Sequence, residues 1–159
     1  MDIITDTHFK VINEINKVTD FSVCYGGSLE DYLNLGYSEK PIGDLDVLIY
    51  DKLLMGVLSE HYDLTEPKPS YFNHFMGEKF TKYNTFIEGI KIDFLVSDYD
   101  YDENLFIETV INGEVIRHRN FQYKIQILKE WVGQSYPNDM WAHEKFSNIL
   151  KKYEDINNK

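Results

Sequence analysis

Hydrophobic positions along the chain recur with two periods, and the changes between them predict the secondary structure. Spacings of three and four residues predict helices, whereas short apolar runs rich in β-branched and aromatic residues predict strands. The predicted helices span residues 7–18, 28–34, 52–62, 122–132 and 139–153. The predicted strands span residues 21–25, 45–50, 78–87, 91–96, 106–111 and 114–119. Because helices and strands do not alternate regularly, the sequence predicts an α/β (α+β) fold with a central mixed sheet and flanking helices.

Turn and cap residues support several of these boundaries. Thr5 offers an N-cap oxygen ahead of the first helix, and Asn112-Gly113 between the last two strands is a typical hairpin turn. Gly26-Gly27 ends the strand at residue 25, and Ser28 is placed to cap the short helix that follows. A strand, a glycine turn and a helix start in this order can bind phosphate, because glycine lets the backbone approach closely and helix amides face the anion.

Aspartates stand in or beside two of the predicted strands. Asp44 and Asp46 lie at the start of the strand over residues 45–50, and Asp93 lies within the strand over residues 91–96. Side chains two positions apart on a strand share a face, so the three carboxylates converge if the two strands are neighbours. Close anions repel one another and are stable mainly around a hard divalent cation. The pattern predicts a metal site, with solvated strand residues as the alternative.

Three ordered motifs carry a family resemblance. Along the chain come Val23-Cys24-Tyr25-Gly26-Gly27-Ser28, then Asp44-Leu45-Asp46-Val47-Leu48-Ile49, then Ile92-Asp93-Phe94. Together they resemble the nucleotidyltransferase superfamily, which has the fold of DNA polymerase β, and they are closest in pattern to its small antibiotic and minimal members. The length of 159 residues predicts one domain over residues 1–159. The resemblance divides it into a nucleotidyltransferase-like core over about 1–119 and a short C-terminal helical tail over about 120–155.

The resemblance also implies an activity and roles for individual residues. The activity is transfer of a nucleoside monophosphate from a nucleoside triphosphate such as ATP to a hydroxyl of a small molecule or protein, with release of pyrophosphate. Asp44, Asp46 and Asp93 would be the catalytic residues and would hold two Mg²⁺ ions, or Asp93 would deprotonate the acceptor hydroxyl. Gly27 and Ser28 would bind the β- and γ-phosphates, with Lys40 as the nearby cation.

Positive charge for a triphosphate is sparse around these motifs. Many antibiotic adenylyltransferases of this fold place arginine or histidine just before the Asp-x-Asp pair, whereas this chain has only Lys40 nearby. Small family members also carry a lysine on the helix after the last strand, which Lys124 or Lys129 would match. The remaining candidate cations are Lys79, Lys82, Lys91, Arg117 and Arg119.

The net charge and the composition limit which classes of binding partner are expected. The net charge of −11 at pH 7 weighs against a long nucleic acid and slightly favours a cationic small molecule or a protein as the acceptor. The single cysteine, Cys24, lies in an apolar strand and is predicted to pack in the core of a cytoplasmic protein. No apolar run approaches the length that crosses a bilayer, so no membrane partner is expected. Trp131 and Trp141 lie on faces of predicted helices and are expected to be packing residues.

Other readings of the same residues remain open. A catalytically weak nucleotidyltransferase fold that acts as a regulatory or antitoxin-like binding partner would fit the sparse basic residues. Retention of three mutually repelling carboxylates favours the enzyme instead. An RNA-directed transferase would need a basic stripe, which the sequence lacks. A second copy of the chain could complete the acceptor site, so a homodimer is a further expectation.

Overall fold

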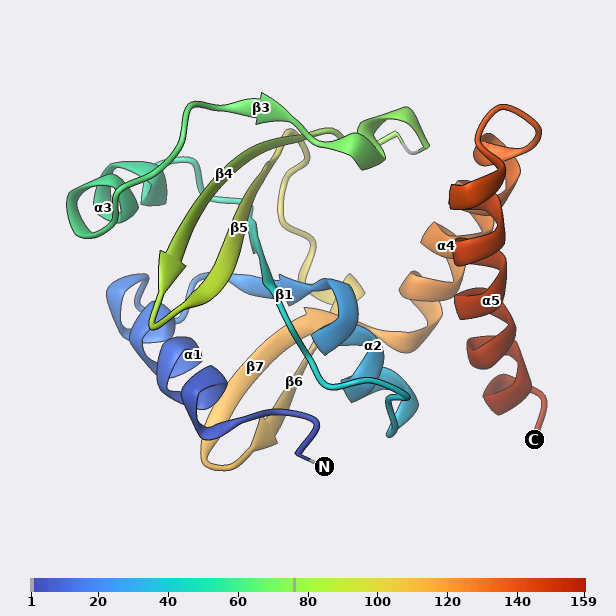
Figure 1. Cartoon of the computed structure of the whole chain (residues 1–159), viewed down its shortest axis with the longest axis horizontal. Helices are drawn as coiled ribbons and strands as arrows, with labels where there is room; N and C mark the ends of the chain where they lie inside the picture. Colours follow the sequence, from blue (N-terminus) through green and yellow to red (C-terminus); the bar gives the residue numbers. More distant parts are fainter. Residues whose placement is uncertain (1, 76) are drawn as a thin grey trace.

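A seven-stranded mixed sheet runs through the chain in the order β3-β4-β5-β2-β1-β7-β6 (Figure 1). The computed structural model describes residues 2–75 and 77–159. The strands are β1 (Cys24–Gly26), β2 (Leu45–Ile49), β3 (Lys68–Pro69), β4 (Phe80–Ile87), β5 (Ile90–Ser97), β6 (Phe106–Ile111) and β7 (Glu114–Arg119). The helices are α1 (Asp6–Val18), α2 (Gly27–Leu35), α3 (Leu54–His61), α4 (Phe121–Ser135) and α5 (Met140–Asn157), with 3₁₀ turns η1 (Tyr71–His74) and η2 (Glu103–Leu105). The predicted α/β class with a central mixed sheet is confirmed.

The two strands that carry the aspartates are neighbours. β2 pairs in parallel with β5 and places Asp46 opposite Asp93, and β1 pairs antiparallel with β2 on its other side, with Gly26 opposite Asp46. The hairpins β4–β5 and β6–β7 turn at Glu88-Gly89 and Asn112-Gly113, whose positive φ angles are those a tight hairpin turn needs. The adjacency on which the carboxylate patch depends is therefore confirmed.

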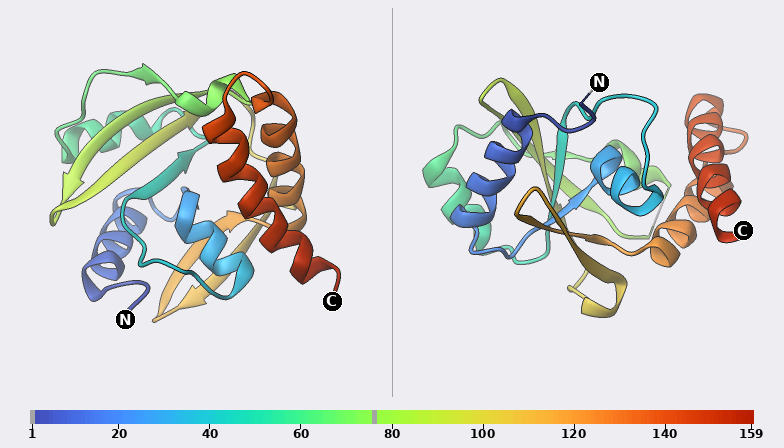
Figure 2. Two further views of the ribbon diagram at one scale, coloured as in Figure 1. Left: turned by 45° about the vertical axis from the view of Figure 1, so that its right-hand side comes forward. Right: turned by 90° about the horizontal axis from the view of Figure 1, so that it is seen from below.

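Side-chain alternation gives the sheet two faces with separate cores. Val47 of β2 belongs to the core covered by α1 and α3, whereas Leu48 of β2 and Leu95 of β5 belong to the core packed by α4 and α5. Seen from below, α1 and α3 lie on one side of the sheet and α4 and α5 on the other (Figure 2). Because Asp46 and Asp93 share the face of Leu48 and Leu95, their carboxylates point toward the C-terminal helices.

The C-terminal helices form a hairpin with an aromatic inner side. Trp131 of α4 stacks on Phe72 of η1 with ring centroids 5.1 Å apart, and Phe146 of α5 lies 4.7 Å from Trp131. The ammonium of Lys124 lies 5.3 Å from the centroid of the same indole. Trp131 is 7% exposed, which confirms its predicted packing role. The indole is therefore enclosed by Phe72, Phe146 and Lys124, and the three aromatic rings form a wall between the sheet and the C-terminal helices.

Trp141 differs from its predicted role. Its side chain is 64% exposed, so the prediction that it is a packing residue is wrong. The buried stripe of α5 runs through Ala142, Phe146 and Tyr153. Consecutive helical residues point about 100° apart, which turns Trp141 away from this stripe and toward solvent.

Two boundary predictions around the first glycine turn are also wrong. β1 begins at Cys24 rather than at residue 21, because Phe21 has a φ of 58° that is incompatible with an extended strand. Ser28 does not cap α2, because extended Gly26 occupies the cap position and α2 has no side-chain cap. The Ser28 hydroxyl is therefore not committed to the helix start.

The side chain of Cys24 is buried in the core. Cys24 is 1% exposed in β1, and burial raises the pKa of its thiol to about 12. A thiol with this pKa stays protonated near neutral pH, so Cys24 is a packing residue, as predicted, and not a nucleophile.

Within residues 2–75 and 77–159, the structure contains no helix with the length and apolar character that crossing a membrane requires.

Candidate active site

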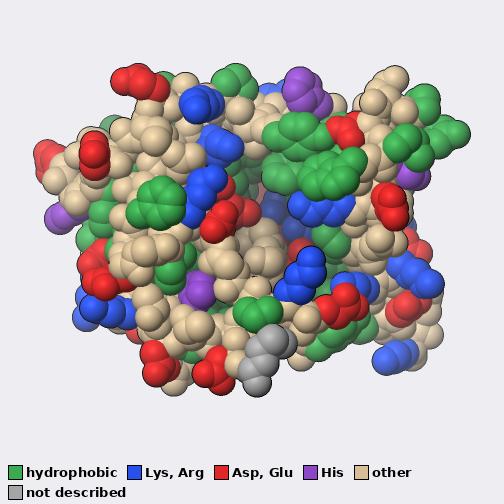
Figure 3. Space-filling view, viewed as in Figure 1, with side chains coloured by type: hydrophobic (Ala, Val, Ile, Leu, Met, Phe, Trp, Pro, Cys, Tyr) green, Lys and Arg blue, Asp and Glu red, His purple; other side chains and the backbone are tan. Residues whose placement is uncertain are grey.

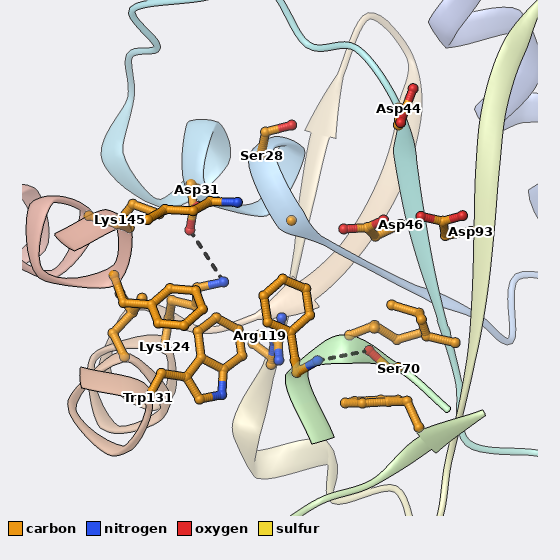
Figure 4. Close-up of a pocket in the computed structure, with 18 residues that line it drawn as sticks. Ser28, Asp31, Asp44, Asp46, Ser70, Asp93, Arg119, Lys124, Trp131 and Lys145 are labelled. Atoms are coloured by element: carbon orange, nitrogen blue, oxygen red, sulfur yellow. Dashed lines mark hydrogen bonds and ion pairs between the residues drawn. The ribbon is translucent and has the colours of Figure 1, made fainter. Parts of the chain in front are cut away.

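Two of the three predicted carboxylates lie side by side on the sheet face that points to α4 and α5. Figure 4 shows the carboxylates of Asp46 and Asp93 next to each other, as their pairing across β2 and β5 dictates. Asp44 lies just before β2, is exposed, and directs its carboxylate away from the other two. Among the described residues, no three acidic, histidine or cysteine side chains are gathered around one point closely enough for a metal ion. The structure thus brings together two carboxylates of the expected three.

Gly27 brings the start of α2 against Asp46. It has a φ of 62°, and a methyl group in place of its hydrogen would overlap with the Asp46 carboxylate. Glycine is needed here for both its backbone conformation and its lack of a side chain. Ser28 follows in the first turn of α2 and faces the same cavity. The predicted glycine turn and the predicted carboxylates therefore meet in one place.

A cavity of about 340 Å³ lies between this sheet face and the C-terminal helices. The space-filling view shows the hollow bordered by acidic, basic and hydrophobic side chains (Figure 3). Its polar lining residues are Ser28, Asp31, Asp44, Asp46, Ser70, Asp93, Arg119, Lys124 and Lys145. Its apolar lining residues are Leu48, Phe72, Phe80, Leu95, Leu128, Trp131, Phe146 and Ile149. An apolar wall that faces converging polar groups is typical of a small-molecule site, and charged groups are unusually numerous in this one.

A buried cluster of opposite charges ties α2 to β7 and α4 beside this cavity. The carboxylate of Glu30 is 0% exposed and accepts hydrogen bonds from Nε and Nη2 of Arg119 and from Nζ of Lys124, each at 2.8 Å. The ammonium of Lys124 also lies 3.4 Å from Oδ1 of Asp31, which accepts a 2.7 Å hydrogen bond from the Tyr153 hydroxyl. Both cations reach the cavity wall, yet each already has a carboxylate partner.

These contacts keep Glu30 ionised. Burial by itself raises the pKa of this carboxyl, but the charges and hydrogen bonds of Arg119 and Lys124 outweigh burial and lower the pKa to about 2. A bidentate guanidinium–carboxylate pair also fixes geometry, because two parallel hydrogen bonds define the plane of both groups. Glu30 therefore holds Arg119 and Lys124 in place as part of the cavity wall.

The Asp46–Asp93 pair suits a divalent cation. Burial, followed by the neighbouring Asp93, raises the pKa of Asp46 to about 6. Oδ1 of Asp93 is buried and has no hydrogen-bond partner among the described residues. Free carboxylate oxygens next to a cavity are the ligands that Mg²⁺ prefers, together with substrate phosphates. The donor set present therefore fits such an ion.

We expect Asp46→Asn to stabilise the metal-free protein in a pH-dependent way. Because the folded-state pKa of about 6 exceeds the ordinary aspartate value of 3.8, the folded protein binds more protons between these values and loses stability as pH rises through them. The variant removes this loss, so it should be more stable than the parent by up to about 3 kcal/mol at pH 8 and by little at pH 4. Urea unfolding in a chelator measures the difference.

Asp100→Asn is the matched control, because Asp100 is exposed in the loop after β5. It should leave the stability nearly unchanged at both pH values. An Asp46→Asn variant that is equally stable or less stable than the parent at pH 8 would contradict a raised pKa of Asp46 in the folded protein.

Most of the basic residues that the sequence offered for binding a triphosphate lie outside the first cavity. Lys40 is exposed and lines a second cavity of about 730 Å³, which shares Ser28, Asp31, Lys145 and Ile149 with the first. Of the remaining candidate cations, Arg119 and Lys124 line the first cavity. The linings of both cavities leave out Lys79, Lys82, Lys91, Arg117 and Lys129.

The structure adds residues that the motifs did not indicate. Lys145 of α5 extends into the first cavity on the side of Ser28 and Asp31 (Figure 4). Glu30 and Asp31 follow the glycine turn directly and pair with cations from β7 and α4. Glu30 has one sequence signal, since it is an acidic residue on the inward side of a short helix, but nothing local identifies its partners.

Comparison with known proteins supports the fold through structure alone. No protein-family model matches the sequence, and no curated protein matches it. A Thermotoga maritima protein assigned as a nucleotidyltransferase aligns with a TM-score of 0.64 and 15% identity, over 90% of this chain and 97% of its own. The crystal structure of ANT(2″)-Ia in complex with adenylyl-2″-tobramycin aligns with a TM-score of 0.51 and 13% identity, over 94% and 98%. The chain therefore has the fold of the nucleotidyltransferases.

Proposed function

We propose that this protein is a Mg²⁺-dependent nucleotidyltransferase that transfers a nucleoside monophosphate from a nucleoside triphosphate to a hydroxyl group. The observation that carries the proposal is the pairing of Asp46 with Asp93, in register on adjacent strands and directly against Gly27 at the start of α2. This arrangement places metal ligands beside a backbone that can bind phosphate, at the wall of a cavity large enough for part of a nucleotide.

Each residue of the predicted site has a role in this proposal. Asp46 and Asp93 would hold the divalent ions, and Asp44, which lines the same cavity, would be the third ligand after its carboxylate turned toward the other two. When bound, the ions stabilise negative charge on the attacking and leaving oxygens. Gly27 presents its backbone to the phosphates, and the uncommitted Ser28 hydroxyl donates to a phosphate oxygen.

The reaction is an in-line displacement at the α-phosphorus. The acceptor oxygen forms a bond to that phosphorus, and the bond from phosphorus to the oxygen that bridges to the β-phosphate breaks. Pyrophosphate leaves with that oxygen and the bonding electron pair, and the hydroxyl proton passes to Asp93. The buried Oδ1 of Asp93, which has no partner among the described residues, is the atom that receives it.

The acceptor in this proposal is a small molecule, with a protein hydroxyl as the alternative. ANT(2″)-Ia, which shares the fold, is seen with adenylyl-2″-tobramycin, an adenylylated small molecule. The net charge of −11 disfavours a nucleic acid acceptor. We further propose a cytoplasmic setting, from the single buried cysteine, and a second copy of the chain that completes the acceptor site.

Thermal unfolding with each of the four nucleoside triphosphates, with and without Mg²⁺, tests the proposal. A ligand that binds only the folded state, at a hundred times its dissociation constant, adds about 2.7 kcal/mol. We expect a Mg²⁺-dependent stabilisation by at least one nucleotide in the parent protein and none in Asp46→Asn. If no nucleotide stabilises the parent while Asp46→Asn is itself more stable, the proposal fails and a regulatory binding partner becomes the better account.

A further inference from the structure

The sheet face that carries the two paired aspartates continues past the first cavity onto β4. The register of β4 and β5 places four further side chains on this face: Lys82, Asn84, Phe86 and Lys91. Asn84 lies directly opposite Asp93, and side chains opposite each other on antiparallel strands point to the same face. None of the four lines the first cavity, and Phe86 is 70% exposed. The C-terminal helices therefore leave this part of the face open to solvent.

Two lysines stand side by side on the open part of the face. Lys68 of β3 lies directly opposite Lys82 of β4. In the described part of the chain, no acidic group lies within ion-pair distance of either lysine. Like charges directly opposite each other destabilise a sheet. The Lys68–Lys82 pair therefore costs the fold stability unless an anion binds between the two ammonium groups.

This lysine pair lies next to the mouth of the first cavity. Lys82 is opposite Leu95, which lines that cavity. The space-filling view shows basic side chains beside acidic ones on the left edge of the hollow (Figure 3). Lys82 is also diagonal to Asp93 across β4 and β5, a position about 7 Å away. An anion held by the lysine pair would therefore lie close to the reacting groups.

The geometry of the proposed reaction brings the acceptor to this side of the aspartates. The sheet order β4-β5-β2-β1 puts Gly27, which follows β1, and the lysine pair on opposite sides of Asp46 and Asp93. In an in-line displacement the attacking and leaving oxygens lie on opposite sides of the phosphorus. If pyrophosphate leaves toward Gly27 and Ser28, the acceptor hydroxyl arrives over Asp93 from the direction of β4.

We propose that the acceptor is a small phosphorylated alcohol, and that Lys68 and Lys82 bind its phosphate group. The inference rests on the proposed function, because it names the class of acceptor for the same reaction. A phosphate monoester carries about 1.5–2 negative charges near neutral pH, which matches two ammonium groups. The same two charges repel a cationic acceptor. The net charge of −11 disfavours a long nucleic acid, so the phosphate belongs to a small molecule.

The transfer step leaves the acceptor's own phosphate unchanged. The acceptor hydroxyl oxygen bonds to the α-phosphorus, its proton passes to Asp93, and pyrophosphate leaves with the bridging oxygen. The lysine pair touches only the acceptor's phosphate and holds the hydroxyl in reach of the α-phosphorus. Exposed Phe86, on the same face, offers an apolar surface for the carbon skeleton of the acceptor.

Pyrophosphate release with Mg²⁺ and each nucleoside triphosphate tests the proposal with matched acceptor probes. The probes are glycerol 3-phosphate against glycerol, ribose 5-phosphate against ribose, and glucose 6-phosphate against glucose. Tobramycin serves as a cationic probe, and a short RNA with a free 3′-hydroxyl as a nucleic acid probe. We expect at least one phosphorylated alcohol to accelerate release above the rate with water. Its KM should be roughly tenfold to a hundredfold lower than that of its unphosphorylated partner.

Variants of Lys82 test the lysine pair itself. Lys82→Gln nearly keeps the size of the side chain and removes its charge, so it should raise the KM for the phosphorylated probe by roughly tenfold to a hundredfold. The KM for the unphosphorylated partner should change much less. Lys82→Arg should retain most of the affinity, since it keeps the charge. Lys129→Gln removes the same charge from an exposed position on α4 and should match the parent.

Two further measurements separate this effect from damage to the fold or to donor binding. Because Lys82→Gln relieves the repulsion by Lys68, urea unfolding should show that the variant is at least as stable as the parent. Its Mg²⁺-dependent thermal stabilisation by a nucleoside triphosphate should persist, since the donor lies on the other side of Asp46 and Asp93. Loss of that stabilisation would assign the lysine pair to the donor and overturn the proposal.

The remaining outcomes separate the acceptor class from the enzyme. If every phosphorylated alcohol is used no better than its partner, or if tobramycin or RNA is the preferred acceptor, the acceptor class is overturned while the proposed function stands. If Lys82→Gln and Lys129→Gln behave alike, the lysine pair does not bind the phosphate. If the parent neither binds a nucleotide nor releases pyrophosphate, the proposed function fails. Calorimetry with the phosphorylated alcohols then decides: binding weakened by Lys82→Gln keeps the phosphate site, and its absence overturns that site too.

Discussion

Replacing Glu30 by glutamine is expected to lower the free energy of unfolding by roughly 3–5 kcal/mol, the cost of breaking a buried ion pair by removing one partner. The substitution keeps the size of the side chain, but among the described residues it removes the one ion-pair partner of buried Arg119 and leaves buried Lys124 with Asp31 at 3.4 Å. Glu108→Gln is the matched control, because Glu108 pairs with Arg117 at 2.9 Å but is 53% exposed. An exposed pair of this kind contributes about 0–1 kcal/mol.

The difference between Glu30→Gln and the parent should also depend on pH. The folded-state pKa of Glu30 is lowered to about 2 from the ordinary glutamate value of 4.5, so its stabilisation is present above pH 4.5 and is lost as pH falls toward 2. Urea unfolding near pH 7 and near pH 3 should therefore show a larger deficit at the higher pH. An equal deficit at both pH values, or one no larger than that of Glu108→Gln, would show that the buried charges are not coupled to folding.

Asp93→Asn is expected to lower the rate of nucleotidyl transfer by roughly 10²–10⁴-fold, the usual contribution of a general base. Nucleotide affinity should change much less, because Asp46 would still hold the metal of the nucleotide complex and phosphate binding at Gly27 and Ser28 remains. The rate can be followed before the acceptor is known, by measuring pyrophosphate release from each nucleoside triphosphate with water as the acceptor. Asp100→Asn, in the loop after β5, is the control and should match the parent.

Two results would contradict the role of Asp93. A variant that releases pyrophosphate at the parental rate would show that Asp93 takes no part in the reaction. A variant that loses nucleotide affinity and rate in equal measure would assign Asp93 to binding alone.

Local sequence patterns predict the strands because side-chain alternation is a short-range rule, and they predict that Asp46 and Asp93 meet on the condition that β2 and β5 are neighbours. Alternation assigns each strand residue to a face, so Asp46 and Asp93 had to lie together once β2 and β5 were neighbours. The hairpin over residues 106–119 follows from its Asn112-Gly113 turn in the same way. The link between Gly27 and Asp46 was implied by the resemblance, and the structure gives its physical reason, because a larger side chain would occupy the space of the carboxylate.

Other features depend on contacts between distant segments. Lys145 reaches the site only because α5 packs beside α2, and Glu30 meets its partners only because β7 ends next to that helix. No local pattern carries this information. Asp44 lies at the edge of β2, where strand geometry no longer controls the direction of a side chain. The packing prediction for Trp141 was wrong because tertiary contacts decide which side of α5 is buried, and Trp141 lies outside the buried stripe of that helix.

The distribution of charge matters more for substrate choice than its total. The net charge of −11 suggests a cationic partner when taken over the whole chain. In the described part of the chain, the acidic pair lies on the sheet, whereas Lys40 of segment 36–41 and Lys145 and Lys151 of α5 line the second cavity. Metal ions and phosphates need opposite charges at neighbouring places, which this separation provides.

The central claim is that Asp46 and Asp93 bind the metal of a nucleotide complex, and a crystal structure with Mn²⁺ and a non-hydrolysable nucleoside triphosphate tests it most directly. The anomalous signal of Mn²⁺ identifies the ion without reference to its ligands. We predict an ion within coordination distance of both carboxylates, with the triphosphate against Gly27 and Ser28. An ion bound away from both aspartates, or a nucleotide bound elsewhere on the protein, would contradict the account.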